Sequence, residues 1–136
     1  MLRIVDEMNN EGTLIIKDEG NKLKFKIEEH NTGEEKTIKL GLKKLKKLYR
    51  SIDKYVNYDE IKRDDKDGCS YVLEKNKKFL EVELCVVNYG FVIGELTDSG
   101  RQDNWVVITV EDEEMEDILK ELERKINELE GDTNEK

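Results

Sequence analysis

The stretch from Lys36 to Val56, KTIKLGLKKLKKLYRSIDKYV, joins a short strand pattern directly to an amphipathic helix pattern. Residues 36–40 predict a strand, and from Leu42 onward the apolar residues recur at spacings of three and four, as on one face of a helix. The apolar positions of this helix are Leu42, Leu45, Leu48, Tyr49, Ile52, Tyr55 and Val56. Lysines occupy the opposite side, so the stretch predicts a strand that leads into a half-buried helix.

Three further strand patterns precede this stretch, at residues 2–5, 12–17 and 22–27. The third pattern alternates strictly between apolar and basic residues, which is the two-residue period of a half-buried strand. Its two faces are Leu23, Phe25, Ile27 and Lys22, Lys24, Lys26. The turn signal at residues 31–33 separates it from the strand at 36–40. The first 56 residues therefore predict four strands followed by one helix.

The same order of elements recurs in the second half of the chain. Strand patterns lie at residues 71–74, 79–87, 91–96 and 105–110, and a second helix pattern follows an acidic start at residues 111–114, where the helix dipole favours negative charge. The apolar positions of this helix are Met115, Ile118, Leu119, Leu122, Ile126 and Leu129. The repetition of strands and helix indicates an internal duplication of a β-β-β-β-α unit.

A single shift of 70 residues aligns the two halves from their last strand into their helix, placing Ile38 on Ile108. The same shift places Leu14 on Leu84 but fails at Phe25, which meets Glu95, so a loop length must differ there. The sequence predicts an α+β fold of two β-β-β-β-α repeats, with antiparallel sheets each packed by one helix. The repeats are expected at about residues 1–56 and 69–130 of a single domain, 1–136, with a linker at 57–68 and a short tail at 131–136.

Charge is distributed unevenly along the chain. The 136 residues hold 24 basic and 33 acidic side chains, a net charge of −9, which at first argues against a polyanionic partner. However, residues 21–55 hold 11 basic and 5 acidic side chains, whereas residues 111–136 hold 4 and 12. The chain is therefore a basic segment of +6 joined to an acidic C-terminal helix of −8, and a nucleic-acid partner is not excluded.

Composition also limits the location of the protein. No apolar run approaches the ~20 residues that a membrane span needs, so no membrane contact is expected. The two cysteines are too few for a disulfide scaffold and favour a reducing, cytoplasmic location.

The layout resembles a known family of folds. Residues 76–82 (NKKFLEV) open one long strand, residues 89–93 (YGFVI) form the next, and residues 107–115 run from strand into helix. A four-stranded antiparallel sheet followed by one helix, used twice, is similar to the Pur-alpha type of single-stranded nucleic-acid-binding domain, and more broadly to the whirly and transcriptional coactivator p15 superfamily. The basic Lys-Gly-Arg turn of such domains is replaced here by residues 88–90 (NYG). The resemblance implies a partner of single-stranded DNA or RNA.

Single-strand binding needs cations along the phosphates and exposed aromatic faces on which bases stack. The candidate residues for this role are Lys22, Lys24, Lys26, Lys77, Lys78, Tyr89, Arg101 and Trp105. Lys36 and Lys39 are expected to share one face of the next strand and to extend the basic surface. The competing interpretation is that the aromatic residues, including Phe25, Phe79 and Phe91, pack in the core and that the lysines only protect strand edges.

An enzymatic role is not expected. His30 is the single histidine, and the sequence has no nucleophile elbow, phosphate-binding loop, dinucleotide fingerprint or His/Cys metal cluster, so no cofactor or metal is predicted. The main alternative is an acidic inhibitor or immunity-type protein that binds a basic protein partner through Glu113, Glu114 and Asp117. A small anionic ligand held by Arg101 and the lysines is a third alternative. The acidic helix could also serve solubility alone, and a homodimer is compatible with all three functions.

Overall fold

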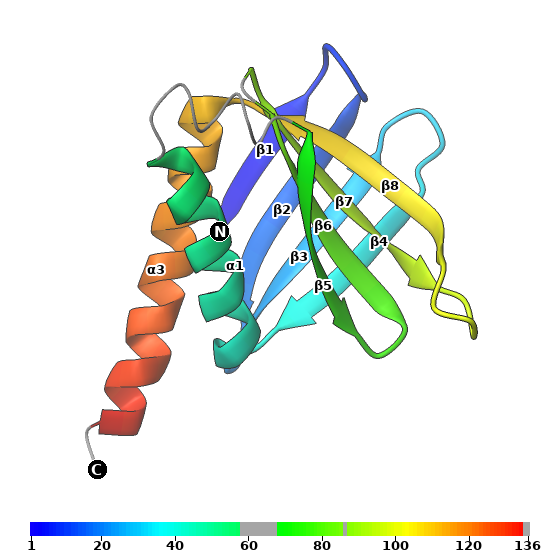
Figure 1. Cartoon of the computed structure of the whole chain (residues 1–136). Helices are drawn as coiled ribbons and strands as arrows, with labels where there is room; N and C mark the ends of the chain where they lie inside the picture. The colour runs from blue at the N-terminus through cyan, green and yellow to red at the C-terminus, as the bar shows by residue number, and fades with distance from the viewer. Residues whose placement is uncertain (58–67, 86, 135–136) are drawn as a thin grey trace.

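The computed structural model describes residues 1–57, 68–85 and 87–134, and it contains two four-stranded antiparallel sheets, each followed by a helix (Figure 1). Sheet A has the order β1-β2-β3-β4 and sheet B the order β5-β6-β7-β8. In the first repeat the elements are β1 (Leu2–Asp6), β2 (Gly12–Glu19), β3 (Lys22–Glu29), β4 (Glu35–Leu40) and α1 (Leu42–Val56). In the second repeat they are β5 (Cys69–Lys75), β6 (Lys78–Leu84), β7 (Tyr89–Leu96), β8 (Gln102–Val110) and α3 (Asp112–Asn134). The predicted fold class is confirmed.

Several strands extend one or two residues beyond their predicted ends, and β8 begins at Gln102 rather than at residue 105. Strand β6 ends at Leu84 rather than at residue 87, and helix α3 continues to Asn134, through residues where the sequence predicted a tail. Most of the predicted linker, residues 58–67, lies outside the described residues. Among the residues that the structure describes, none of the helices has the length and apolar character of a membrane span.

The strand registers correct the alignment of the two repeats. Phe25 faces Ile38 across β3 and β4, and Phe91 faces Ile108 in the same way across β7 and β8. Equivalent residues are therefore 70 positions apart in the fourth strands but 66 apart in the third strands. The difference arises because the hairpin that these strands form is four residues longer in the second repeat, where a bulge interrupts the pairing.

This longer hairpin also changes the correspondence of the second strands. Leu14 faces Ile27 in sheet A, and Leu80 faces Ile93 in sheet B. Leu14 therefore corresponds to Leu80, and its predicted alignment with Leu84 is wrong. The loops that join the third and fourth strands, residues 30–34 and 97–101, have the same length, so the expected difference in loop length is wrong. The shift arises because β7 and β8 pair over more residues and contain a bulge, which a single shift of the sequence could not represent.

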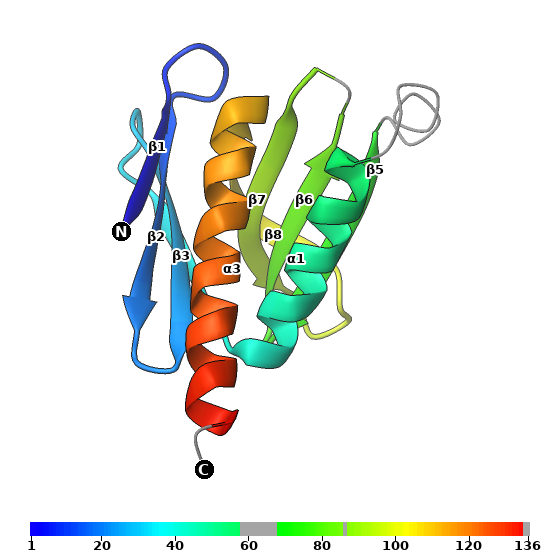
Figure 2. The ribbon, with the colours of Figure 1, turned by 90° about the vertical axis from the view of Figure 1, so that its left-hand side faces the viewer.

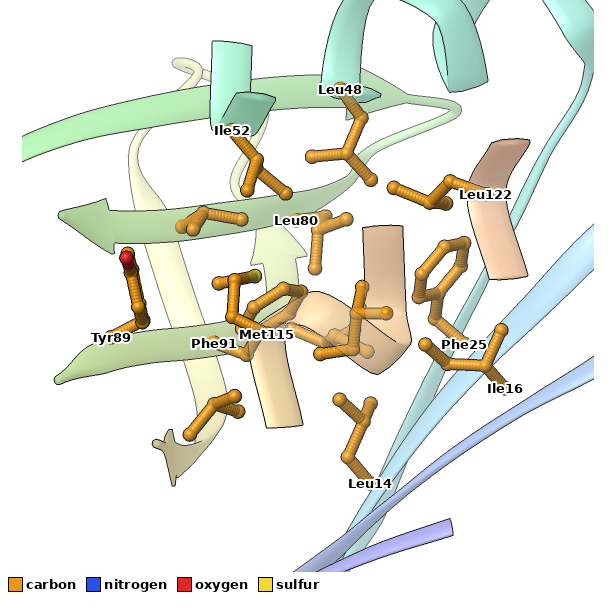
Figure 3. Close-up of a cluster of buried hydrophobic side chains, with 14 of the residues drawn as sticks. Leu14, Ile16, Phe25, Leu48, Ile52, Leu80, Tyr89, Phe91, Met115 and Leu122 are labelled. Carbon is orange, nitrogen blue, oxygen red and sulfur yellow. The ribbon is translucent and has the colours of Figure 1, made fainter. Parts of the chain in front are cut away.

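Both repeats contribute to one hydrophobic cluster that lies between the two sheets and the two helices. Figure 3 labels Leu14, Ile16, Phe25, Leu48, Ile52, Leu80, Tyr89, Phe91, Met115 and Leu122 within it. The core interpretation of Phe25 and Phe91 is confirmed, since both are fully buried members of this cluster. Phe79 is also fully buried, but it lies outside the cluster, beside Gly94. Helices α1 and α3 pack against each other, and Figure 2 shows them side by side in front of the sheets. The outer sheet faces are consequently left uncovered by helices.

A buried carboxylate connects the first hairpin to the second repeat. Asp6 is 6% exposed and accepts backbone N–H bonds from Met8 at 3.1 Å, Asn9 at 2.9 Å and Asn10 at 3.1 Å within its own loop. A fourth N–H, from Thr109 of β8, reaches its Oδ2 at 3.0 Å. Burial raises the pKa of Asp6, but the four donors outweigh burial and hold this pKa below its ordinary value.

Two basic residues of α3 form hydrogen bonds that connect this helix to the β2–β3 hairpin. Lys125 is 1% exposed, and its Nζ donates to the carbonyl oxygen of Gly20 at 2.8 Å. Arg124 donates to both carboxylate oxygens of Asp18, at 2.9 and 3.1 Å. The hydrogen bond from Arg124 is the main reason why the pKa of Asp18 is lowered. Two of the few basic residues of the acidic helix α3 are therefore engaged in contacts within the protein.

Candidate nucleic-acid interface

The side chains of sheet A that point away from the core form a mainly basic surface. Alternation places the buried residues on one side of each strand, so the residues between them point outward. The charged members of this outer face are Arg3, Lys17, Lys22, Lys24, Lys26, Lys39, Glu19, Glu28 and Glu35. We call this surface the basic face. It holds six cations against three carboxylates and has no counterpart on sheet B.

The outer face of sheet B has the opposite character. Its outward positions carry Glu74, Glu81 and Glu83, together with the apolar Val72, Val92, Val107 and Trp105. Within the described strands β5–β8, no lysine or arginine occupies a position with this outward parity. The two repeats therefore share one fold but present outer faces of opposite charge.

Three lysines lie side by side at the centre of the basic face. Lys17 of β2 faces Lys24 of β3, and Lys24 faces Lys39 of β4. Adjacent strands are only about 4.8 Å apart, and like charges directly opposite each other destabilise a sheet. We call these three residues the lysine row. Lys39 was expected to extend the basic surface, but Lys17 was not among the residues chosen from the sequence, because cross-strand register cannot be read from one strand pattern.

One carboxylate partly offsets the lysine row. Glu19 lies 2.5 Å from Nζ of Lys39 and 4.0 Å from Nζ of Lys24. The hydrogen bond from Lys39 is the main cause that lowers the pKa of Glu19. A second pair joins Lys26 to Glu35 at 3.7 Å. These pairs are partly exposed and therefore weak, so the lysines remain available to an anion of higher charge density.

Next to the lysine row the basic face has a small apolar depression. A hollow of about 120 Å³ is lined by Met1, Ile15, Lys17, Lys24 and Lys26. Met1 and Ile15 supply the apolar part of its lining, and the three lysines supply the charged part. The arrangement offers an apolar contact for a base or sugar beside cations for phosphates, which are the two requirements of single-strand binding.

The first candidate lysines, Lys22, Lys24 and Lys26, all lie on the basic face. Lys22, at the start of β3, also lines a second hollow beside α1. The expectation that Lys36 and Lys39 share a face is wrong, because they are an odd number of residues apart. Lys36 instead bonds Glu95 of sheet B at 2.8 Å, and this hydrogen bond is the main cause that raises the pKa of Lys36.

The basic candidates of the second repeat lie apart from the lysine row. Lys77 is in the β5–β6 turn, where its Nζ lies 3.0 Å from the carboxylate of Asp98. Lys78 lines a hollow of about 190 Å³ at the edge of β4. Arg101 is exposed in the loop between β7 and β8, where its backbone N–H donates to Thr97. None of these three lies on the outer face of sheet A.

Tyr89 is not a stacking residue. Its side chain is 1% exposed and meets Tyr55 of α1 edge to face, with ring centroids 6.0 Å apart. Tyr89 has the same parity as Phe91 and Ile93 on β7, so the strand directs it into the core. Its position at a strand start had suggested exposure. The predicted role of Tyr89 is therefore wrong.

Trp105 is accessible for stacking, with 56% of its surface exposed. It lies on the outer face of sheet B beside Gly94, where an added Cβ would be 2.8 Å from the Cβ of Trp105 and 2.7 Å from the ring of Phe79. Gly94 also lines the hollow at the edge of β4, together with Lys36 and Thr37. Gly94 is therefore a neighbour of both Trp105 and the hollow at the edge of β4.

The acidic candidates lie at the start of α3. Glu113 and Asp117 are exposed, whereas Glu114 is half-buried and accepts the backbone N–H of Glu111 at 3.0 Å, which caps the helix. Glu114 therefore has a structural contact that the sequence did not indicate. Within the described ranges, no three His, Cys, Asp or Glu side chains are grouped as metal ligands would be.

Comparison with known proteins identifies the fold. No family model matches the chain, and no curated protein matches it either. Twelve chains of solved structures match. One of them is the plant transcriptional regulator PBF-2, with a TM-score of 0.58 and 13% sequence identity over 96% of this chain and 89% of that chain. At this identity the similarity establishes a shared fold over nearly the whole chain.

Proposed function

We propose that this protein is a non-enzymatic single-stranded nucleic-acid-binding protein that uses the basic face of sheet A. The observation that carries the proposal is the lysine row, Lys17–Lys24–Lys39. Three like charges on adjacent strands reduce the stability of the sheet. A bound polyanion would reverse this cost, because each phosphate neutralises a lysine and releases counterions.

The surroundings of the lysine row support an extended single strand as the ligand. Phosphates would lie along Lys17, Lys24 and Lys39, and a base or sugar would contact Ile15 in the adjacent hollow. Trp105 would stack on a further base where the strand passes over the edge of β4. The resemblance to Pur-alpha and whirly domains and the fold shared with a transcriptional regulator agree with this class of partner.

A salt titration with a fluorescently labelled oligonucleotide tests the proposal. The double variant K17Q/K24Q should bind more weakly, and its slope of log K against log salt should fall by about 1.4, since each single-strand phosphate contact contributes about 0.7. The matched control K54Q/K120Q removes the same charge from the two helices and should leave the slope unchanged. Absence of binding at low ionic strength, or equal effects of both variants, would overturn the proposal.

A basic protein that binds the start of α3 is the second candidate partner. The exposed carboxylates of Glu113 and Asp117 favour it, together with the −8 charge of residues 111–136. Capture of a basic partner by the intact protein should be lost in E113K/D117K. Glu114 is left unchanged in this variant because it caps the helix. Unchanged capture would exclude this surface.

A further inference from the structure

A second cationic cavity lies beside the basic face, at the end of the molecule where α1 begins. It has a volume of about 320 Å³ and is lined by Lys22, Gly41, Leu42, Lys43, Lys44, Lys47 and Lys75. Five of these residues are lysines, and they come from three different elements, β3, α1 and β5. None of the described residues that line it is acidic. We call this cavity the lysine hollow.

The lysines of the hollow are crowded enough to affect one another. Lys75 reaches across from sheet B, and its Nζ donates to the carbonyl oxygen of Lys39 at 2.7 Å. Burial is the main cause that lowers the pKa of Lys75, and the neighbouring charges of Lys22, Lys44 and Lys39 lower it further. The protein thus holds positive charges together in one cavity at an electrostatic cost.

The equivalent position in the second repeat has the reverse charge. Lys43 and Lys44, in the first turn of α1, correspond to Glu113 and Glu114 of α3, which suit the helix dipole. Helix α1 also lacks a side-chain cap at Gly41 and has no acidic residue in its first turn. The unfavourable charge pattern is therefore specific to the first repeat, where it adds to the lysine hollow instead of stabilising the helix.

We infer that the lysine hollow binds the terminal phosphate monoester of the single strand that lies on the basic face. This inference rests on the proposed function. Lys22 connects the two sites, because it lines the hollow and shares its outward strand face with Lys24 and Lys26. A terminal phosphate carries nearly two negative charges at neutral pH, against one for each internal phosphate, so it matches a cluster of five lysines better.

The inference is tested with three labelled oligonucleotides of identical sequence that carry a 5′-phosphate, a 3′-phosphate or neither. One phosphorylated end should raise the affinity of the intact protein about tenfold, as expected for new charge-assisted hydrogen bonds. The gain should shrink below about pH 6, where the monoester takes up a proton. The unphosphorylated oligonucleotide at the same pH is the reference, so a loss confined to the phosphorylated one reports the phosphate itself.

The variant K43Q/K44Q should lose the gain from the terminal phosphate and keep most of the affinity for the unphosphorylated strand. It should fold well, because removing lysines from a helix N-terminus improves the dipole interaction. The control R50Q/K54Q removes the same charge from later turns of α1 and should keep the gain.

The outcomes separate the inference from the proposed function. Equal affinity for all three oligonucleotides would overturn the inference while leaving the proposed function intact. Failure of every oligonucleotide to bind would overturn both. Inorganic pyrophosphate is the final probe: if it raises the melting temperature through Lys43 and Lys44 while the oligonucleotides remain indistinguishable, the hollow is a free-anion site and the strand-end assignment is wrong.

Discussion

Among single residues, Asp6 has the clearest structural consequence. Its carboxylate satisfies three N–H groups of its own loop and one of Thr109 in the second repeat. Asp6→Ala should lower the free energy of unfolding by roughly 2–4 kcal/mol, since buried donors lose a charged acceptor. The exposed neighbour Glu7→Ala is the control and should change little. Chemical denaturation measures both, and similar stability of the two variants would contradict the hydrogen-bond pattern.

Asp6 also predicts a pH dependence with a defined sign. Its pKa in the folded protein lies below the ordinary value of 3.8. The carboxylate therefore stabilises the fold above about pH 4, and this contribution is lost as the pH falls through the folded-state pKa. Denaturation midpoints of the intact protein should fall over this acidic window, and Asp6→Asn should flatten that part of the profile. An unchanged profile in Asp6→Asn would contradict the assignment.

Trp105 is the only tryptophan of the chain, so its fluorescence reports on one known position. An oligonucleotide that stacks on the exposed indole should quench this emission, and Trp105→Ala should weaken binding by about 1–3 kcal/mol. Trp105→Phe should retain part of the affinity because a smaller ring still stacks. Emission that stays constant while anisotropy reports binding would remove Trp105 from the interface.

At the scale of elements, the lysine row predicts a conflict between stability and binding. Lys24 faces a lysine on each side, so Lys24→Thr should raise the free energy of unfolding by about 0.2–1 kcal/mol. Oligonucleotide affinity should decrease in the same variant. Thermal denaturation and anisotropy together measure the two effects. A variant that is both less stable and unchanged in binding would show that the row is structural.

The periodicity within a strand could be predicted from the sequence, whereas the pairing between strands could not. Strict alternation predicted β3, with Phe25 inward and Lys24 outward, because the two sides of a strand can be read from its own sequence. Register between strands depends on hairpin length, so the partnership of Lys17 with Lys24 was not visible. Tyr89 was misplaced because its position at a strand start outweighed its shared parity with Phe91. The five lysines of the hollow come from three elements and could not be grouped before the fold was known.

For the whole molecule, the shared core predicts that neither repeat folds alone. The hydrophobic cluster contains residues of both sheets and both helices, so an isolated first repeat would expose most of it. Residues 1–57 are also close to the lower size limit for an independent domain. This fragment should show no cooperative thermal transition by circular dichroism, whereas the full chain should show one. A sigmoidal two-state transition of the fragment would contradict the shared core.

The distribution of charge is also a property of the whole molecule. The net charge of −9 conceals a molecule whose two sheets present opposite outer faces. The basic face and four of the five lysines of the hollow belong to the first repeat, whereas Lys75 and the acidic surfaces belong to the second. The two repeats thus share one fold but differ in the charge of their outer faces.

Binding on the basic face is best tested by an NMR titration of the isotope-labelled protein with a short single-stranded oligonucleotide. Amide shifts should concentrate on β2, β3 and β4 around Lys17, Lys24 and Lys39, with little change along α3. Shifts confined to sheet B or to the region of Glu113 and Asp117 would contradict it, as would the absence of any shift at low salt.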